Sequence, residues 1–466
     1  MSASGFTPRQ RRVVLLMILI VVVVFALLTG FLVTSLQSME RSAIRASSSQ
    51  MTAWPTVSPS SPPPATSSPL EEDGFWPQVR AARLFDQIAH QVEVERALSP
   101  RAEVPLSFLS EIEMEETLQV RYSEEKLRSE QLPLNMLGLL PDTTMEIQTA
   151  APAGIYVAEW EQLYALVDRP ENDIEMQTLL AHAYVHALQD QHFDLAGMHT
   201  RAQTTDERLA LQALIEGDAA LATALYSNDE LSSADWDRLT VLLIEAEQPH
   251  FSDELADCAA RDSLQRFPYR EGRTFAATLY EQGSWNAINS SYTNPPRSTE
   301  QVLHPSRYVV VDSDAGQVDQ PSPVVVPDLG PILGEEWQIL VEDTLGEFVT
   351  SLYLEQGLPE ERARDIADGW DGDTFNVWQR DNGTRLQVWR TIWDTTTEAL
   401  EFEQGLSLLI PQREFPVRPI SPPRDLPGKW WEVRAGTVYV GRTGRYVLLV
   451  RAPDTNALIN ALEALP

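Results

Sequence analysis

The feature that most constrains this chain is an uninterrupted apolar run near its N-terminus. Residues 13–39 carry no charged side chain and include the segment VVLLMILIVVVVFALLTGFLV. At 1.5 Å per residue, a helix of about 20 apolar residues crosses about 30 Å of hydrocarbon. We therefore predict one transmembrane helix at residues 13–36, in contact with the lipid bilayer. A cleaved signal peptide is the alternative, but its apolar core normally spans only about 7–15 residues.

The sequence around and within this span predicts its orientation. Three arginines lie in residues 1–12, whereas Arg41 and Arg45 follow the span, with Glu40 between the span and Arg41. The positive-inside tendency therefore favours a cytoplasmic segment at 1–12 and an extracytoplasmic location for the bulk of a single-pass membrane protein. The small residues Ala26, Gly30 and Thr34 recur at four-residue spacing, which would let two such helices form a weak dimer.

A linker is predicted at residues 37–70. Ser, Pro and Thr dominate residues 46–70, so this stretch cannot form a packed core. Its prolines favour extended backbone, and at about 3 Å per residue the linker would reach several tens of ångströms. The folded part of the chain is thus expected to stand away from the membrane.

The composition excludes some partners and some metal sites. Lys and Arg number 35 against 68 Asp and Glu, which gives an acidic protein with a net charge of −33 and no basic cluster suited to nucleic acid. An acidic surface also repels anionic lipid headgroups. Cys258 is the only cysteine, so an intrachain disulfide and a cysteine-based zinc cluster are both impossible. Any metal must be held by histidine and carboxylate side chains.

The remaining sequence predicts an α+β fold in two domains. Residues 71–330 are expected to form a mainly helical domain with a small sheet or hairpin, and residues 331–466 a C-terminal α+β domain with an antiparallel sheet. The proline-rich segment 317–332 marks the boundary. In the second domain, the apolar spacing of 337–354 predicts one amphipathic helix. Asn-Gly at 382–383, between two β-rich runs, predicts a hairpin.

Two histidines on one predicted helix are the first chemical signal. Residues 153–168 read as a hairpin and 174–192 as the helix that follows. His182 and His186 are four residues apart, so both imidazoles project from one side and could hold a single tetrahedral cation. Two histidines at this spacing are more often a surface or packing accident, so the pair alone is weak evidence.

Around these histidines the sequence resembles a bacterial family of membrane-associated, zincin-like metallopeptidases. The matching segments are AHAYVHALQDQHFDL at 181–195, ALIEGDAAL at 213–221, FPYREGRTFAATLYEQGSW at 267–285 and STEQVLHPSRY at 298–308. Members carry a His-Glu-x-x-His helix and, on a later helix, a glutamate that completes a gluzincin-type zinc site. The resemblance therefore implies a zincin-like domain and a Zn²⁺ site formed by His182, His186 and Glu216.

The chain departs from the family at the residue that performs the chemistry. In such peptidases the glutamate after the first histidine takes a proton from the attacking water. This chain has Ala183 in that position, within HAYVH, and a methyl group cannot accept a proton. Loss of general acid–base catalysis lowers rates by about 10²–10⁴-fold. We therefore assign no catalytic residue and expect peptidase turnover to be absent or vestigial.

Other polar residues near these motifs have competing explanations. His304 and Tyr308 lie in the last motif, and zincin clefts often use a remote histidine or tyrosine to steady an oxyanion. Pinning the local loop is the alternative role for both. His192 points about 240° around the helix from the pair, so we expect a cap or packing role. Asp190 and Asp194 are expected to be solvated or to support neighbouring groups.

Two features of the C-terminal domain also allow two interpretations. Asp371 and Asp373 flank Gly372 and could suggest calcium, but two aspartates without further ligands more often form a turn. Trp430 and Trp431 could form a binding face or could pack the sheet. The sequence does not decide either case.

We therefore expect a membrane-anchored, extracytoplasmic pseudo-metallopeptidase rather than an enzyme. It would act as a binding or assembly module for an unidentified protein or peptide, and it could retain a divalent metal. An active zinc metallohydrolase that uses a different base is one alternative. A metal-free structural subunit of a membrane complex, with relic histidines, is the other.

Overall fold

A computed structural model describes most of the chain after residue 74. The described ranges are 75–121, 124–141, 147–148, 151–166, 173–227, 233–247, 250–251, 258–308, 319–423 and 426–465. All of them belong to one unit of the chain, Ser60–Pro466. None of the helices in these ranges is both long and apolar enough to cross a bilayer. The predicted span at 13–36 and the predicted linker at 37–70 lie outside the described residues.

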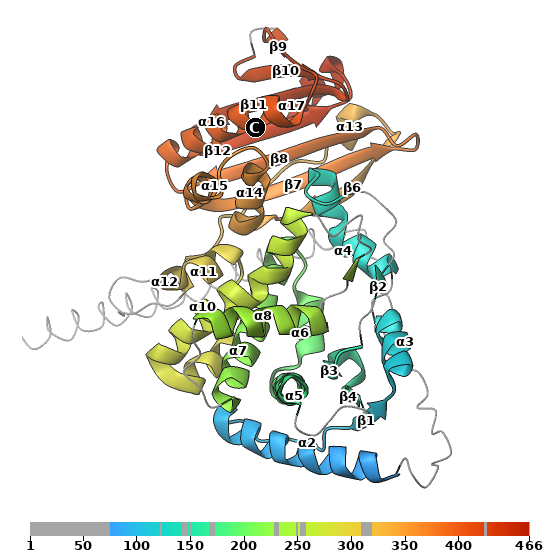
Figure 1. The fold of residues 1–466 in the computed structure, drawn as a ribbon. Coiled ribbons are helices and arrows are strands. Elements are labelled where there is room, and N and C mark those ends of the chain that lie inside the picture. Colours follow the sequence, from blue (N-terminus) through green and yellow to red (C-terminus); the bar gives the residue numbers. More distant parts are fainter. Residues whose placement is uncertain are drawn as a thin grey trace, which may run out of the picture. The chain divides into compact units, whose positions relative to one another are not determined.

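The fold is α+β, with a helical N-terminal part (Figure 1). Its helices are α2 (Phe75–Arg96), α3 (Glu111–Arg121), α4 (Glu124–Leu137), α5 (Ile174–Phe193), α6 (Leu195–Arg201), α7 (Thr205–Tyr226), α8 (Ser233–Glu247), α10 (Ala259–Ser291), α11 (Thr299–Leu303) and α12 (Pro305–Tyr308). A small sheet accompanies them, made of β1 (Leu106–Leu109), β3 (Gly154–Val157) and β4 (Gln162–Leu166). Strands β3 and β4 are antiparallel, which confirms the predicted hairpin. The short strands β2 (Ile147–Gln148) and β5 (His250–Phe251) pair separately.

Helix α5 confirms the predicted element but is more deeply buried than one apolar face would require. Its N-cap Asp173 accepts a hydrogen bond from the Met176 amide, which fixes the first turn. Every residue from Thr178 to Gln189 is buried, because α2, α7, α8 and β3 all contact the helix. Figure 1 shows α5 nearly end on among these elements. A helix buried on all sides must satisfy every polar group that it carries from within the protein.

Helices α7 and α10 approach each other closely at two glycines. A Cβ atom added to Gly217 would collide with the backbone of Gly272, and one added to Gly272 would collide with the backbone of Ala213. Thr204 and Glu207 form a capping box that sets where α7 begins. The crossing therefore holds α7 firmly at the turn beside Glu216.

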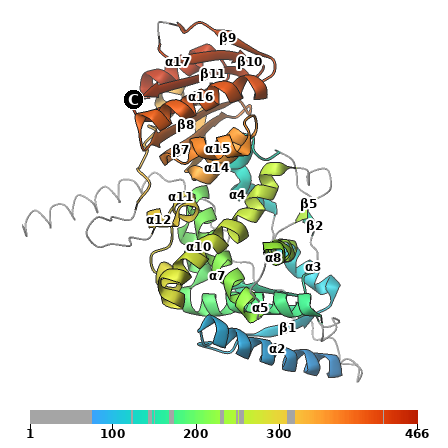
Figure 2. The same ribbon diagram turned by 60° about the vertical axis from the view of Figure 1, so that its left-hand side comes forward.

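The C-terminal part is a seven-stranded antiparallel sheet with the order β6-β7-β8-β12-β11-β10-β9 (Figure 1), and Figure 2 shows the same sheet from a second direction. Its strands are β6 (Trp337–Asp343), β7 (Trp370–Arg380), β8 (Arg385–Trp393), β9 (Val417–Ile420), β10 (Lys429–Val433), β11 (Gly436–Thr443) and β12 (Tyr446–Ala452). Its helices are α13 (Gly330–Leu333), α14 (Gly346–Glu355), α15 (Glu360–Ala367), α16 (Thr396–Arg413) and α17 (Thr455–Ala464). The β7–β8 hairpin turns at Gly383, whose φ of 82° suits the predicted Asn-Gly turn.

Both faces of this sheet are covered. One face packs in the same apolar cluster as α14, α15 and α16, and the other packs in a second cluster with α17. Trp431 belongs to the first cluster and Trp430 to the second, as expected for neighbours on a strand. Their exposed fractions are 6% and 2%, so the tryptophans pack the sheet and do not form an exposed binding face.

The single helix predicted at 337–354 is wrong in its first half. Residues Trp337–Asp343 form the edge strand β6, paired with β7, and only Gly346–Glu355 is helical. Sheet pairing outweighs the helical spacing of the apolar residues here. The two elements separate at Gly346, whose φ is 84°.

Asp371 and Asp373 lie in strand β7, at an irregularity around Gly372, and not in a turn. The buried Asp373 carboxylate accepts hydrogen bonds from the Leu345 and Gly346 amides and from Trp370 Nε1. These contacts tie β7 to the start of α14. Asp373 therefore has a structural role, and its oxygens are engaged by N–H donors.

Candidate metal centre

Four donor side chains converge in the helical part. His182 and His186 project from α5, and their Nε2 atoms lie 3.1 Å apart. Glu216 projects from α7, with Oε2 at 3.4 Å from His182 Nε2 and 3.5 Å from His186 Nε2. The structure thus brings together the three residues that the resemblance assigned to a metal.

The fourth donor is Glu247, which the sequence analysis did not single out. Its Oε1 lies 3.5 Å from His182 Nε2 and 3.6 Å from His186 Nε2. Its other oxygen accepts a hydrogen bond of 3.2 Å from the Tyr269 hydroxyl. Five of the six separations among the four donor atoms run from 3.1 to 3.6 Å, all four atoms lie within 4.8 Å of one another, and the group could hold a metal ion.

The orientation of the His182 ring is fixed by its other nitrogen. Nδ1 lies 3.1 Å from Thr223 Oγ1, and that hydroxyl donates its own hydrogen to the Ala219 carbonyl at 2.7 Å. Thr223 can therefore only accept from His182, so the proton of the neutral imidazole resides on Nδ1. The lone pair of Nε2 then faces the cluster.

His186 is held in the same way by an amide. Its Nδ1 lies 2.8 Å from Gln189 Oε1. The amide nitrogen of Gln189 donates to the Ile215 carbonyl at 3.1 Å and to Asp218 Oδ2 at 2.8 Å, which fixes the orientation of the amide. His186 therefore carries its proton on Nδ1 and also presents the Nε2 lone pair to the cluster.

A buried network surrounds Asp218 and supports this arrangement. Arg96 Nε contacts Oδ1 at 2.7 Å, and Arg96 Nη2 donates to Oδ2 at 2.9 Å. The Tyr292 hydroxyl also donates to Oδ2, at 2.7 Å. Arg96 and Asp218 are both fully buried, and their pairing offsets the penalty of removing each charge from water. Through Gln189, this network positions His186.

The electrostatics of the cluster favour positive charge at its centre, carried by protons or by a metal ion. Two imidazole lone pairs and two carboxylates face one another, and Glu216 Oε2 is buried without a hydrogen-bond partner among the described residues. Burial lowers the pKa of both His182 and His186, but Glu247 and Glu216 outweigh it and raise both pKa values. Burial raises the pKa of Glu247, yet the two histidines hold it well below its usual range. With neutral imidazoles the four side chains carry a formal charge of −2, which a divalent metal would neutralise.

Ala183 follows the first histidine within α5. Its side chain is fully buried and belongs to the main apolar cluster. Among the described residues, the carboxylates within ion-pair distance of the two Nε2 atoms are Glu216 and Glu247. Position 183 therefore contributes an apolar contact and no base.

The other polar residues on and after α5 lie outside the cluster. His192 Nε2 donates to the Ser99 carbonyl at 2.8 Å, which is the packing role expected for it. Asp190 accepts from the Tyr156 hydroxyl at 2.7 Å. Asp194 caps α6. None of the three belongs to the four-residue group.

The structure does not bring His304 or Tyr308 into this group. His304 Nε2 lies 2.9 Å from Glu347 Oε1 and 3.0 Å from Asp368 Oδ1, and these three side chains form a second, more exposed group of donors. Arg307 pairs with the same carboxylates, so the group is already supplied with positive charge. The Tyr308 hydroxyl donates to a backbone carbonyl, at residue 294.

Comparison with known proteins places one part of the chain. Residues 338–462 match the family model of a domain of unknown function, DUF8575. This region runs from β6 into α17 and does not include the four-residue group. No curated protein and no solved structure is significantly similar to the chain.

Proposed function

We propose that this chain is a membrane-anchored, extracytoplasmic pseudo-metallopeptidase whose zincin-like helical domain holds Zn²⁺ in a closed site. Zinc bonds to His nitrogen at about 2.0–2.1 Å and to carboxylate oxygen at about 2.0–2.2 Å, so neighbouring ligands of a tetrahedral site lie about 3.3–3.5 Å apart. The His–His separation and the four His–Glu separations among His182, His186, Glu216 and Glu247 run from 3.1 to 3.6 Å. The agreement supports zinc as the ion.

The position of Glu247 is the observation that carries this proposal. Catalytic zinc sites keep one coordination position open for water, whereas structural sites are closed by four protein ligands. Glu247 Oε1 lies at nearly equal distances from the two histidine nitrogens, 3.5 and 3.6 Å, where it can serve as the fourth ligand. When bound, zinc would cross-link α5, α7 and α8.

Ala183 supports the same conclusion independently. Hydrolysis requires an open coordination position for water on the metal and a general base, and the proposed site lacks both. Binding of a partner requires only the folded surface. The domain would then act as a binding or assembly module for an extracytoplasmic protein or peptide. Its helix at 13–36 would anchor it in the membrane and could support a weak dimer.

Metal analysis of the full-length protein, purified in detergent, tests the site. We expect one zinc per chain in the unaltered protein and its loss in His182→Ala. His192→Ala is the matched control, because this histidine is on the same helix and contacts the Ser99 carbonyl instead of the cluster. Negligible metal in all three proteins would contradict the proposal and favour the metal-free structural subunit.

An active metallohydrolase is the second candidate, and Glu247 is also the observation that favours it. A carboxylate beside the two histidines could act as a proton acceptor instead of a ligand. In that case the unaltered protein would cleave peptides, and Glu247→Gln would lose turnover while retaining zinc. The closed site predicts no turnover in the unaltered protein.

The predicted topology has its own test. Protease added to intact cells that express the full-length chain should digest the residues after position 36 and spare residues 1–12. An N-terminal tag that is cleaved under the same conditions would contradict the proposed orientation.

A further inference from the structure

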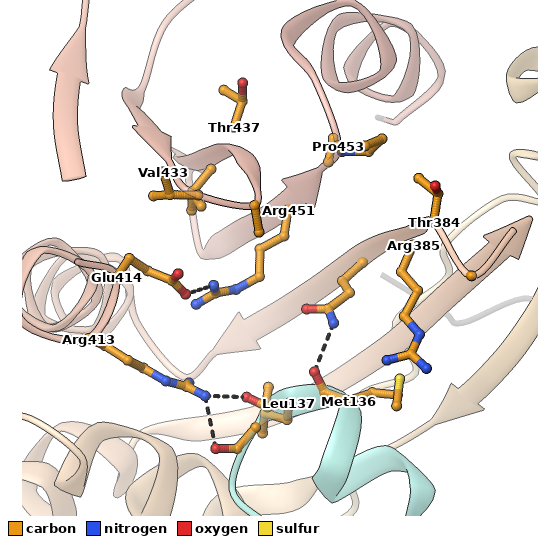
Figure 3. A pocket seen from close by; sticks show the side chains of 16 residues that line it. Met136, Leu137, Thr384, Arg385, Arg413, Glu414, Val433, Thr437, Arg451 and Pro453 are labelled. Carbon is orange, nitrogen blue, oxygen red and sulfur yellow. Dashed lines mark hydrogen bonds and ion pairs between the residues drawn. The ribbon is translucent and has the colours of Figure 1, made fainter. Parts of the chain in front are cut away.

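A pocket lined by residues other than the four metal-site candidates suggests a second binding site. The cavity measures about 520 Å³ and lies between the end of α4 and the C-terminal sheet (Figure 3). Pockets of about 300–1,000 Å³ are typical of small-molecule sites. Among the lining residues are Leu137, Gly138, Arg385, Arg413, Glu414 and Arg451.

The charge of this pocket is opposite to that of the protein. Three arginines and one glutamate line it, although the chain as a whole has a net charge of −33. Arg451 forms an ion pair with Glu414 and also donates to the Tyr353 hydroxyl at 2.8 Å. Figure 3 shows Arg413 and Arg451 on one side of the pocket and Arg385 on the other.

Arg413 is the residue whose charge is left without a counter-ion. Its Nη2 donates to the carbonyls of Leu137 and Gly138, at 2.8 and 2.9 Å, and its guanidinium lies 4.9 Å from the ring centre of Tyr353. Among the described residues no carboxylate lies within ion-pair distance of it, and its Nη1 is buried without a hydrogen-bond partner. A partly buried cation without an anion is costly.

Gly138 shows that the chain accommodates this arginine specifically. Its φ is 75°, a conformation that favours glycine, and an added Cβ atom would collide with Arg413 Nη2. The end of α4 therefore leaves room for the guanidinium beside the pocket. Gly138 and Arg413 lie far apart in the sequence, so the fold is what joins them.

We propose that this pocket binds a small organic anion whose acidic group pairs with the guanidinium of Arg413. Carboxylate and phosphate share the recognition chemistry, because an oxygen of either can accept charge-assisted hydrogen bonds from a guanidinium group. Arg385 and Arg451 add positive charge from the two sides. The ligand would supply the counter-ion that Arg413 lacks within the protein. This proposal is independent of the metal centre.

Calorimetric titration of the full-length protein in detergent at low salt tests the proposal. The probes are succinate, inorganic phosphate and the neutral succinamide. We expect saturable binding of at least one anion, and the stronger of the two identifies the acidic group. Arg413→Gln should weaken it about 10- to 100-fold, the usual effect of losing hydrogen bonds to a charged group. Arg364→Gln is the matched control, because Arg364 is exposed and pairs with Glu360 on α15.

Two more variants keep the test decisive if Arg413→Gln does not fold. Gly138→Ala retains every charge but displaces Arg413, and it should also weaken binding. The exposed Arg385→Gln should fold normally and weaken binding several-fold. No saturable binding of either anion, equal binding of succinamide, or binding unchanged in these variants would overturn the proposal.

Discussion

The proposed closed metal site makes a specific prediction about restoring hydrolysis. Ala183→Glu would supply the base that the peptidase family uses, but Glu247 would still occupy the fourth position. Glu247→Ala would open that position to water, but Ala183 would still provide no base. Only the double variant meets both requirements, so we expect it alone to cleave peptides.

The expected gain in cleavage rate follows from the general base that Ala183→Glu supplies and the water position that Glu247→Ala opens. General acid–base catalysis contributes about 10²–10⁴-fold. The double variant should therefore exceed Glu247→Ala by at least about 100-fold, while Ala183→Glu alone stays at background. Position 183 is 0% exposed, so the larger side chain also strains the core. Overpacking typically costs about 1–3 kcal/mol, and thermal unfolding must show that each variant remains folded.

The assay is cleavage of a fluorogenic peptide library by zinc-loaded protein, with zinc content measured for each variant. Ala183→Gln combined with Glu247→Ala is the matched control, because glutamine has the shape of glutamate but is not a base. If Ala183→Glu alone equals the double variant, Glu247 does not close the site. If the double variant does not exceed its glutamine control, position 183 is not the place of the missing base.

Three further predictions concern the surroundings of the site and the stability of the fold. Gln189→Leu removes the acceptor of His186 Nδ1–H, so zinc affinity should fall about 10–100-fold in a chelator competition, and an unchanged affinity would contradict the supporting network. Burial raises the pKa of Asp373 to about 6, above a value of about 3.9 in the unfolded chain, so the folded protein binds this proton more tightly. The stability that the bound proton adds is complete below about pH 4 and is lost as the pH rises through about 6. Denaturant unfolding should show the unaltered protein losing about 3 kcal/mol relative to Asp373→Asn between pH 4 and pH 8; parallel pH profiles would refute this. Gly217→Ala forces the α7–α10 crossing apart and should lower the unfolding free energy by about 1–3 kcal/mol, whereas an unchanged midpoint would show that the crossing relaxes freely.

Local patterns predicted much of the fold because they carry their own physical reason. Asn382-Gly383 requires positive φ, and the hairpin forms there. The strand β6 was missed because its apolar residues also fit helical spacing, and pairing with β7 decides between the two. Such pairing joins residues distant in the chain, so a local pattern cannot show it.

The candidate metal centre also contains residues that the sequence predicted and one that it did not. His182 and His186 share a helix face, and the family resemblance adds Glu216. Glu247 comes from α8, where no motif surrounds it. One signal was available, because Glu247 follows Leu239 and Leu243 at four-residue spacing and so continues the buried side of the helix. An acidic residue on such a face needs a partner, but the sequence does not show which one.

A crystal structure of the zinc-loaded, full-length protein would test the central claim most directly. We predict one zinc bound by His182, His186, Glu216 and Glu247, with no water in its coordination shell. A zinc bound by three side chains and a water, with Glu247 turned away from the ion, would contradict the closed site.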